Sequence, residues 1–144
     1  MINNRLILNV YEDSSSKKKI STQLLYGDKF KIIKRFNNML KIKTSYDNYV
    51  GYITKRKFPE NEKQTHKISI LKAKLYSQPN IKSKLNKCIS FCSYIKVKNY
   101  KNNFYNFDKY WIKKEDIVPV ESKIKIFGNI KMFKNTKYKW GGNS

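Results

Sequence analysis

The 144-residue chain has few of the residues that build metal or thiol sites, with two cysteines and one histidine. A structural zinc site takes four thiolate or imidazole ligands in close pairs, which this chain does not supply. Four residues along a strand would place Cys88 and Cys92 about 13 Å apart, too far for a disulfide. We therefore expect no metal and no cofactor, and we expect both cysteines to pack as small hydrophobic residues in the interior.

Long apolar runs are also missing. No run approaches the roughly 18 residues that a membrane-spanning helix needs. The first residues hold only a short apolar stretch, 6–10, without a small-residue cleavage site, and so predict no secretory signal peptide. We therefore expect a cytoplasmic protein without a membrane partner, with a periplasmic or cell-wall location left open.

Arginine is scarce, because only three of the 32 basic residues are arginines. The net charge is +22, but Lys, Asn, Ile and Tyr, all with AT-rich codons, make up about half of the chain, so genome composition alone could raise lysine everywhere. Nucleic-acid binders usually cluster arginine as well as lysine along one element. The pattern argues against a nucleic-acid partner, although adhesion to an acidic polymer is physically easy at this charge.

Short alternating runs between turn signals predict a mainly β protein. In the first half, strands are expected over 6–11, 30–36, 39–43 and 49–53, with turns at 26–28, 37–38 and 47–48. Residues 54–65 contain Pro59, start with basic residues and lack apolar alternation, which is typical of a linker. A second series of strands begins at Lys67.

The two halves look like one module used twice. Tyr11 and Tyr76 are 65 residues apart, Phe30 and Tyr94 are 64 apart, and the Tyr52-Ile53 pair corresponds to Trp111-Ile112 at an offset of 59. Each copy is the size of a small SH3-like barrel. We predict a first barrel over 1–54, a linker over 55–66, a second barrel over 67–119, and a different segment over 120–144.

That last segment changes period. Ile126, Ile130 and Phe133 follow helical spacing, and Ser122 could cap the start of the helix. After the helix come Tyr138 and the Trp140-Gly141-Gly142 turn. We expect this helix to begin a domain that the chain does not complete.

Five segments, taken in order, carry a family resemblance: 22–28 with 30–33, 47–53, 75–79, 111–112 and 138–144. Together they resemble the N-terminal part of NlpC-type cell-wall cysteine peptidases, in the branch of γ-D-glutamyl-diamino-acid endopeptidases. The resemblance implies two SH3-like domains followed by the first helix of an α+β, papain-like peptidase domain. It also implies that the catalytic Cys and His follow beyond Ser144, since Cys88, Cys92 and His66 do not occupy matching positions.

The resemblance implies substrate-binding residues in this chain. Tyr138 matches a tyrosine beside the nucleophile and is a candidate for the oxyanion side of the site, with Trp140, Gly141 and Gly142 close to the peptide. Tyr49 resembles a tyrosine that, together with an acidic residue, binds the free amine of a terminal L-Ala. No acidic partner for Tyr49 is identifiable from the sequence.

The resemblance thus predicts the substrate-gating part of a murein-peptide endopeptidase. Its expected partners are a peptidoglycan-derived peptide and the missing C-terminal peptidase domain, and the chain is expected to be inactive alone. Two alternatives stay open: a non-catalytic cell-wall-binding protein of SH3-like barrels, and a basic barrel pair that binds nucleic acid.

Overall fold

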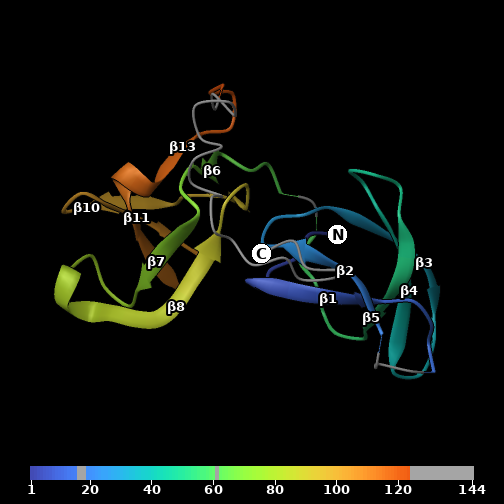
Figure 1. Ribbon diagram of the computed structural model, residues 1–144. Coiled ribbons are helices and arrows are strands. Elements are labelled where there is room, and N and C mark those ends of the chain that lie inside the picture. The colour runs from blue at the N-terminus through green and yellow to red at the C-terminus, as the bar shows by residue number, and fades with distance from the viewer. Residues whose placement is uncertain (16–18, 61, 124–144) are drawn as a thin grey trace. The chain divides into compact units, whose positions relative to one another are not determined.

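The computed structural model describes residues 1–15, 19–60 and 62–123, and the chain divides into two compact units (Figure 1). We call residues 1–62 unit 1 and the part that begins at Lys63 unit 2. The described residues form antiparallel strands and two short 3-10 turns, without an α-helix among them. The mainly β prediction is confirmed. The division into four segments stays a prediction, and His66, expected at the end of the linker, already belongs to a strand.

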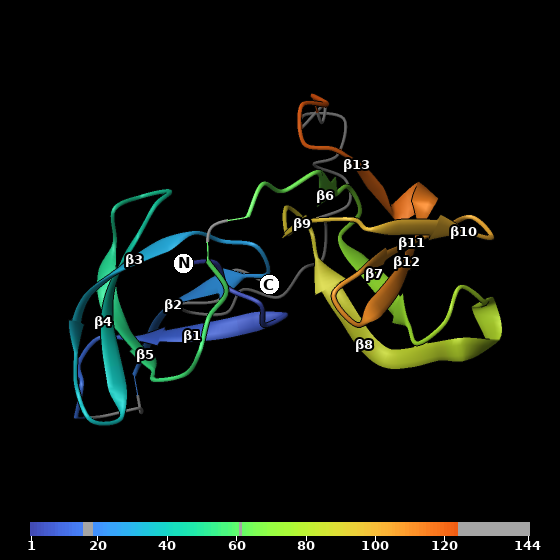
Figure 2. The same ribbon diagram turned by 180° about the vertical axis from the view of Figure 1, so that it is seen from behind.

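Unit 1 contains one five-stranded sheet with the order β2-β1-β5-β4-β3 (Figures 1 and 2). Its strands are β1 (Ile7–Tyr11), β2 (Ile20–Leu25), β3 (Phe30–Arg35), β4 (Met39–Thr44) and β5 (Val50–Thr54). The alternation of apolar and polar residues had predicted β1, β3, β4 and β5. The strand β2 was not predicted, because Ser21, Thr22 and Gln23 interrupt the apolar pattern.

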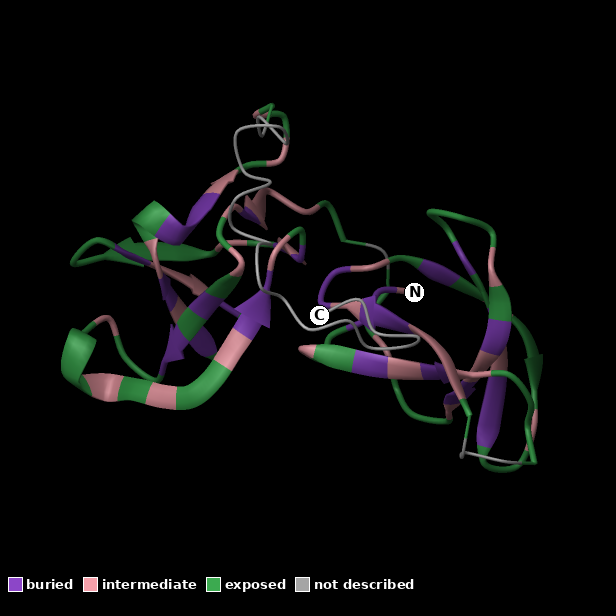
Figure 3. Ribbon diagram, in the orientation of Figure 1, coloured by how far each residue is buried: buried purple, intermediate pink, exposed green. Residues whose placement is uncertain are grey.

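The core of unit 1 lies on one face of this sheet. Buried and more exposed residues alternate along β1, as Figure 3 shows, because successive side chains of a strand point to opposite faces. The buried cluster consists of Leu8, Val10, Leu24, Phe30, Leu40, Ile42 and Ile53. The opposite face of the sheet is therefore available for contact with solvent or a ligand.

Unit 2 contains a five-stranded sheet of order β10-β11-β12-β7-β8 and a three-stranded sheet of order β13-β6-β9. The five-stranded sheet is built from β7 (Lys72–Tyr76), β8 (Lys84–Ser90), β10 (Asn99–Lys101), β11 (Phe104–Phe107) and β12 (Tyr110–Lys113). The remaining elements are β6 (His66–Ile68), β9 (Tyr94–Ile95), β13 (Ile117–Pro119) and the 3-10 turns η1 (Ile81–Ser83) and η2 (Lys114–Asp116).

The two five-stranded sheets have the same strand order when β7, β8, β10, β11 and β12 are placed on β1, β2, β3, β4 and β5. Tyr11 pairs with Tyr52 in unit 1, and Tyr76 pairs with Trp111 in unit 2. These are the residues that the sequence offsets had matched. The correspondence supports a duplicated module, whereas closure of each unit into a barrel stays a prediction.

The predicted C-terminal helix, with Ile126, Ile130 and Phe133, lies outside the described residues, which end at Lys123. The same holds for the predicted site residues Tyr138, Trp140, Gly141 and Gly142.

Candidate functional site

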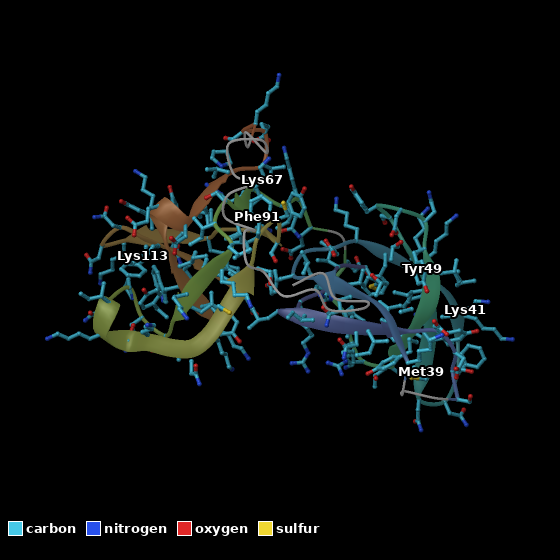
Figure 4. All side chains as sticks on the ribbon, viewed as in Figure 1. Met39, Lys41, Tyr49, Lys67, Phe91 and Lys113 are labelled. Atoms are coloured by element: carbon cyan, nitrogen blue, oxygen red, sulfur yellow. The ribbon has the colours of Figure 1, made fainter. Side chains whose placement is uncertain are left out.

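Tyr49, the one predicted site residue that the structure describes, lies in the turn between β4 and β5 (Figure 4). Its carbonyl oxygen accepts a hydrogen bond from the Thr44 N–H at 2.9 Å. Its half-buried side chain packs against the core cluster of unit 1. A Cβ on Gly51 would lie 3.2 Å from Cε1 of Tyr49 and 2.5 Å from Cγ1 of Val10. Glycine at position 51 thus leaves the room that the tyrosine ring occupies.

Asp47 holds this turn together. Its carboxylate accepts the Thr44 hydroxyl and, at 3.2 Å, the N–H of Tyr49. The hydrogen bond from Thr44 stabilises the charged form and holds the pKa of Asp47 below its ordinary value. Between Asp47 and Tyr49, Asn48 takes a positive φ of 58°, which asparagine tolerates better than most residues. The turn therefore carries an ionised carboxylate directly beside Tyr49.

A second carboxyl group, Asp28, lies in the turn between β2 and β3. One carboxylate oxygen accepts the Leu25 N–H at 2.8 Å, and the backbone N–H of Asp28 donates to the Leu25 carbonyl at 3.1 Å. Gly27 takes a φ of 88°, a conformation that side chains strongly disfavour. The turn thus fixes the Asp28 side chain against its own backbone.

Burial raises the pKa of Asp28 to about 6. The Leu25 N–H opposes this shift, and repulsion by the charge of Asp47 adds to it, so the two carboxyl groups are electrostatic neighbours. Neither carboxyl forms an ion pair within the part of the chain that the structure describes, where the surface pairs are Lys19–Glu12 and Lys113–Glu115. Among the described residues both acidic groups thus lack an ion-pair partner, although the net charge of the chain is +22.

Backbone contacts hold these two turns side by side. The Ser45 N–H donates to the Lys29 carbonyl at 2.9 Å, which joins the start of one turn to the end of the other. The buried Asn3 amide donates to the carbonyls of Leu24 and Leu25, at 3.1 and 2.8 Å, and so fixes the strand that precedes Asp28. We call residues 25–28 and 44–49 together the turn pair.

The sequence predicted Tyr49 as a site residue but did not point to Asp47 in the same turn or to Asp28 in the neighbouring turn. The available signals were the Gly27-Asp28 and Asp47-Asn48 turn dipeptides, which predicted turns at both places. What the pattern did not contain was the contact between the turns, because they are separated by the whole β3–β4 hairpin. The side chains of the turn pair are suited to binding a cation, because they include two carboxyl groups and the Tyr49 phenol.

The cysteines and the histidine do not form a comparable site. Cys88 lies partly buried in β8, and Cys92 is exposed in a turn with a φ of 61°. The interior position expected of both cysteines is wrong for Cys92, because the chain turns there before β9. The His66 ring packs against the Tyr105 ring in a tilted arrangement with centroids 5.2 Å apart. Burial lowers the pKa of His66, and the negative charge of Glu121 opposes this shift.

The described part of the chain has neither a metal-binding cluster nor a membrane-spanning helix. No group of three or more His, Cys, Asp or Glu side chains there is arranged to hold a metal ion. No described helix has the length and apolar character for crossing a membrane.

Comparisons with known proteins point to one kind of relative. Residues 10–58 match the family described as the bacterial dipeptidyl-peptidase Sh3 domain. In structure, the chain is similar to an NlpC/P60 family protein from Bacillus cereus ATCC 10987, with a TM-score of 0.77 and 15% sequence identity. That likeness, which shows a shared fold, covers 99% of this chain but only 66% of the Bacillus protein. No curated protein matches the sequence.

Proposed function

We propose that the chain is the SH3-like, substrate-selecting part of a cell-wall cysteine peptidase of the γ-D-glutamyl-diamino-acid endopeptidase branch. In this proposal the turn pair of unit 1 binds the free amine of a murein peptide. The family match over residues 10–58 and the fold shared with an NlpC/P60 family protein support the relation to a peptidase. The catalytic thiol and its histidine would come from a peptidase domain that follows these residues.

The observation that carries the amine site is Asp28, a largely buried carboxyl with a raised pKa and no ion pair to another described residue. Burial makes the ionised form costly, and an ammonium group placed against the carboxylate would offset that cost. A charge-assisted hydrogen bond of this kind contributes roughly 1.5–3 kcal/mol. Asp28 is therefore our candidate for the acidic partner of Tyr49, with Asp47 adding negative potential from the adjacent turn.

Such a site distinguishes peptides by their amino terminus. A free α-amine has a pKa near 8 and is charged at neutral pH, whereas an acylated amine has no charge to offer. A peptide whose amine is still linked to glycan would leave Asp28 buried and unpaired. The turn pair would then select trimmed murein peptides over intact wall.

Calorimetric titration of the 144-residue chain with L-Ala-γ-D-Glu at pH 7 tests this proposal. We expect binding of the free dipeptide and at least a tenfold loss when its amine is acetylated. We expect Asp28→Asn to produce a similar loss, because an amide cannot pair with the ammonium. The control is Glu60→Gln, which removes one exposed carboxylate of unit 1 and should leave binding unchanged. Equal binding of the acetylated dipeptide would overturn the amine site.

The phenol of Tyr49 has a matched control in the same turn. Tyr46 is 98% exposed, so Tyr46→Phe should not change binding of the dipeptide. Tyr49→Phe should weaken binding about tenfold if the hydroxyl contacts the ammonium, since one hydrogen bond to a charged group is lost. Identical affinities for the two variants would remove Tyr49 from the site and leave the carboxyl groups as its only recognised part.

We also expect the 144-residue chain to be unable to hydrolyse L-Ala-γ-D-Glu-diaminopimelate. Its single histidine packs against the Tyr105 ring, and its Nδ1 lies 3.0 Å from the Thr65 hydroxyl. In this position His66 does not act as the base for a thiol nucleophile. Incubation followed by chromatography of the products checks this. Release of diaminopimelate that is abolished by Cys92→Ser would instead show a nucleophile within the chain.

A further inference from the structure

The outer face of the β3–β4 hairpin in unit 1 carries lysines opposite lysines. In the register of this hairpin, Lys31 faces Lys43 and Lys34 faces Lys41. Lys41 and Lys43 are two residues apart on β4, so both pairs lie on the same face. Figure 4 labels Lys41 on this strand. Four ammonium groups thus gather on two neighbouring strands.

This arrangement opposes the stability of the sheet. Like charges directly opposite one another on a sheet are destabilising, whereas natural pairs usually combine opposite charges. Between Asp28 and Asp47 the sequence contains six basic residues and no acidic residue, so no carboxylate of the hairpin can neutralise the pairs. Repulsion of this kind is relieved when an anion lies between the paired cations.

Genome composition does not account for the pairs, because the corresponding hairpin of unit 2 lacks them. There, β10 and β11 place Asn99 opposite Asn106, Tyr100 opposite Tyr105 and Lys101 opposite Phe104. A bias toward lysine codons would act on both hairpins alike. The lysine pairs are therefore a property of the unit 1 hairpin and not of the whole chain.

The aromatic rings next to these lysines indicate which anion fits. Phe36 and Tyr52 pack together with centroids 5.9 Å apart. Lys34 lies over the Phe36 ring at 5.3 Å, and Lys41 lies over the Tyr52 ring at 5.8 Å. Single-stranded nucleic acids are bound by stacking their bases on free aromatic faces. Because ammonium groups already cover these rings, the face is suited to a chain of phosphates that carries no bases.

We propose that the outer face of β3 and β4 binds a linear polyol-phosphate polymer through Lys31, Lys34, Lys41 and Lys43. Each ammonium would contact a phosphodiester oxygen, and the bound chain would release its counterions. The four lysines are not part of the turn pair, although Lys43 directly precedes Thr44, and the inference does not depend on the amine-binding function. It assigns unit 1 a second, electrostatic contact that would hold the protein on an anionic surface polymer.

The test is a binding titration of the 144-residue chain with fluorescent poly(glycerol phosphate) at several salt concentrations. We expect the double variant Lys31→Gln/Lys43→Gln to bind about tenfold more weakly at low salt. The slope of the logarithm of the association constant against the logarithm of the salt concentration should become shallower by about 1.4, which is about 0.7 for each lost phosphate contact. The matched control is Lys72→Gln/Lys74→Gln, which removes the same charge from exposed positions on β7 of unit 2 and should bind as the unchanged chain does.

Two outcomes would overturn the proposal. If the β7 control loses as much affinity as the hairpin variant, attraction is a matter of net charge alone. If an oligothymidylate of equal charge binds at least as tightly as poly(glycerol phosphate), the face is a nucleic-acid surface. Thermal unfolding of the hairpin variant checks that it is still folded. We expect its melting temperature to be unchanged or higher, because the substitutions relieve repulsion between the lysines.

Discussion

Units 1 and 2 share a hydrogen-bonded frame that repeats after 65 residues. In unit 1 the Gly27 N–H donates to the Asn3 carbonyl at 2.8 Å, and the Asn3 N–H donates to the Asp28 carbonyl at 2.9 Å. In unit 2, Cys92 and Ile68 make the first of these bonds at 3.2 Å, and Ile68 and Ser93 make the second at 3.0 Å. The backbone is therefore the same where the side chains differ.

The side chains on this shared frame distinguish the candidate site of unit 1 from the corresponding turn of unit 2. The counterpart of Asp28 is Ser93, which is fully buried and whose hydroxyl has no hydrogen-bond partner among the described residues. The turn with Thr44, Asp47 and Tyr49 also has no equivalent, because β11 and β12 meet in a short turn after Phe107 pairs with Tyr110. The proposed site of unit 1 thus adds acidic side chains to a backbone frame that unit 2 has without acidic groups at these positions.

The prediction with the largest expected effect tests whether the two units unfold independently of each other. Leu40→Ala should cost unit 1 about 2–5 kcal/mol, because it removes three carbon atoms from a fully buried position of the core cluster. Hydrogen exchange read by mass spectrometry should show faster exchange in β1 to β5 and unchanged exchange in β7 and β12. Ile112→Ala, also fully buried, should give the reverse pattern. Equal loss in both units after either substitution would show one cooperative structure.

A smaller effect concerns the pH dependence that Asp28 gives to unit 1. Its pKa in the folded protein, about 6, lies above the ordinary value of 3.8, so the folded state binds the proton more tightly. The free energy of unfolding should therefore decrease as pH rises from about 4 to 6 and stay lower above that range. Asp28→Asn keeps an acceptor for the Leu25 N–H and should be more stable than the unchanged chain by about 1–2 kcal/mol at pH 7, after allowance for partial exposure of the carboxyl.

Denaturant unfolding at pH 4.5 and pH 7 measures this difference. Glu60→Gln should give the same difference from the unchanged chain at both pH values, because Glu60 is exposed. If Asp28→Asn has the same relative stability at both pH values, the Asp28 carboxyl has an ordinary pKa in the folded protein.

The smallest expected effect is at the counterpart position in unit 2. Ser93→Ala removes a buried hydroxyl that lacks a partner and should leave stability unchanged or raise it by up to about 1 kcal/mol. Calorimetric unfolding measures this change. A loss of more than 1 kcal/mol would mean that the Ser93 hydroxyl contributes to the unit 2 turn, and that the contrast with Asp28 is weaker than described.

The sequence predicted the features that depend on local pattern or on the repeat. Alternation gave β1, β3, β4 and β5 of unit 1, and the offsets matched Tyr11 and Tyr52 with Tyr76 and Trp111. It predicted that a second series of strands begins at Lys67, which lies in β6, but it did not predict β13. Three-residue strands that pair across about fifty residues leave no local signal of that pairing. The exposed position of Cys92 was missed for a related reason, since a strand-like sequence context hid a turn.

The candidate site divides in the same way. Tyr49 was identified by resemblance, and its turn by the Asp47-Asn48 dipeptide. The burial of Asp28 depends on long-range contacts: the Asn3 amide fixes the preceding strand, and the Ser45–Lys29 hydrogen bond brings up the second turn. No pattern along the chain encodes such contacts. Tyr138, Trp140, Gly141 and Gly142 stay predictions, because they lie outside the described residues.

The pairing of Lys43 with Val50 closes the ladder between β4 and β5 just before the turn that carries Asp47 and Tyr49. Residues 45–48 are exposed, so the core ends before they begin. Evolution or protein engineering could therefore exchange this short segment, in sequence and in length, without repacking the hydrophobic interior. Variation among related modules in what they recognise would then be concentrated in a few residues at one end of an otherwise constant sheet.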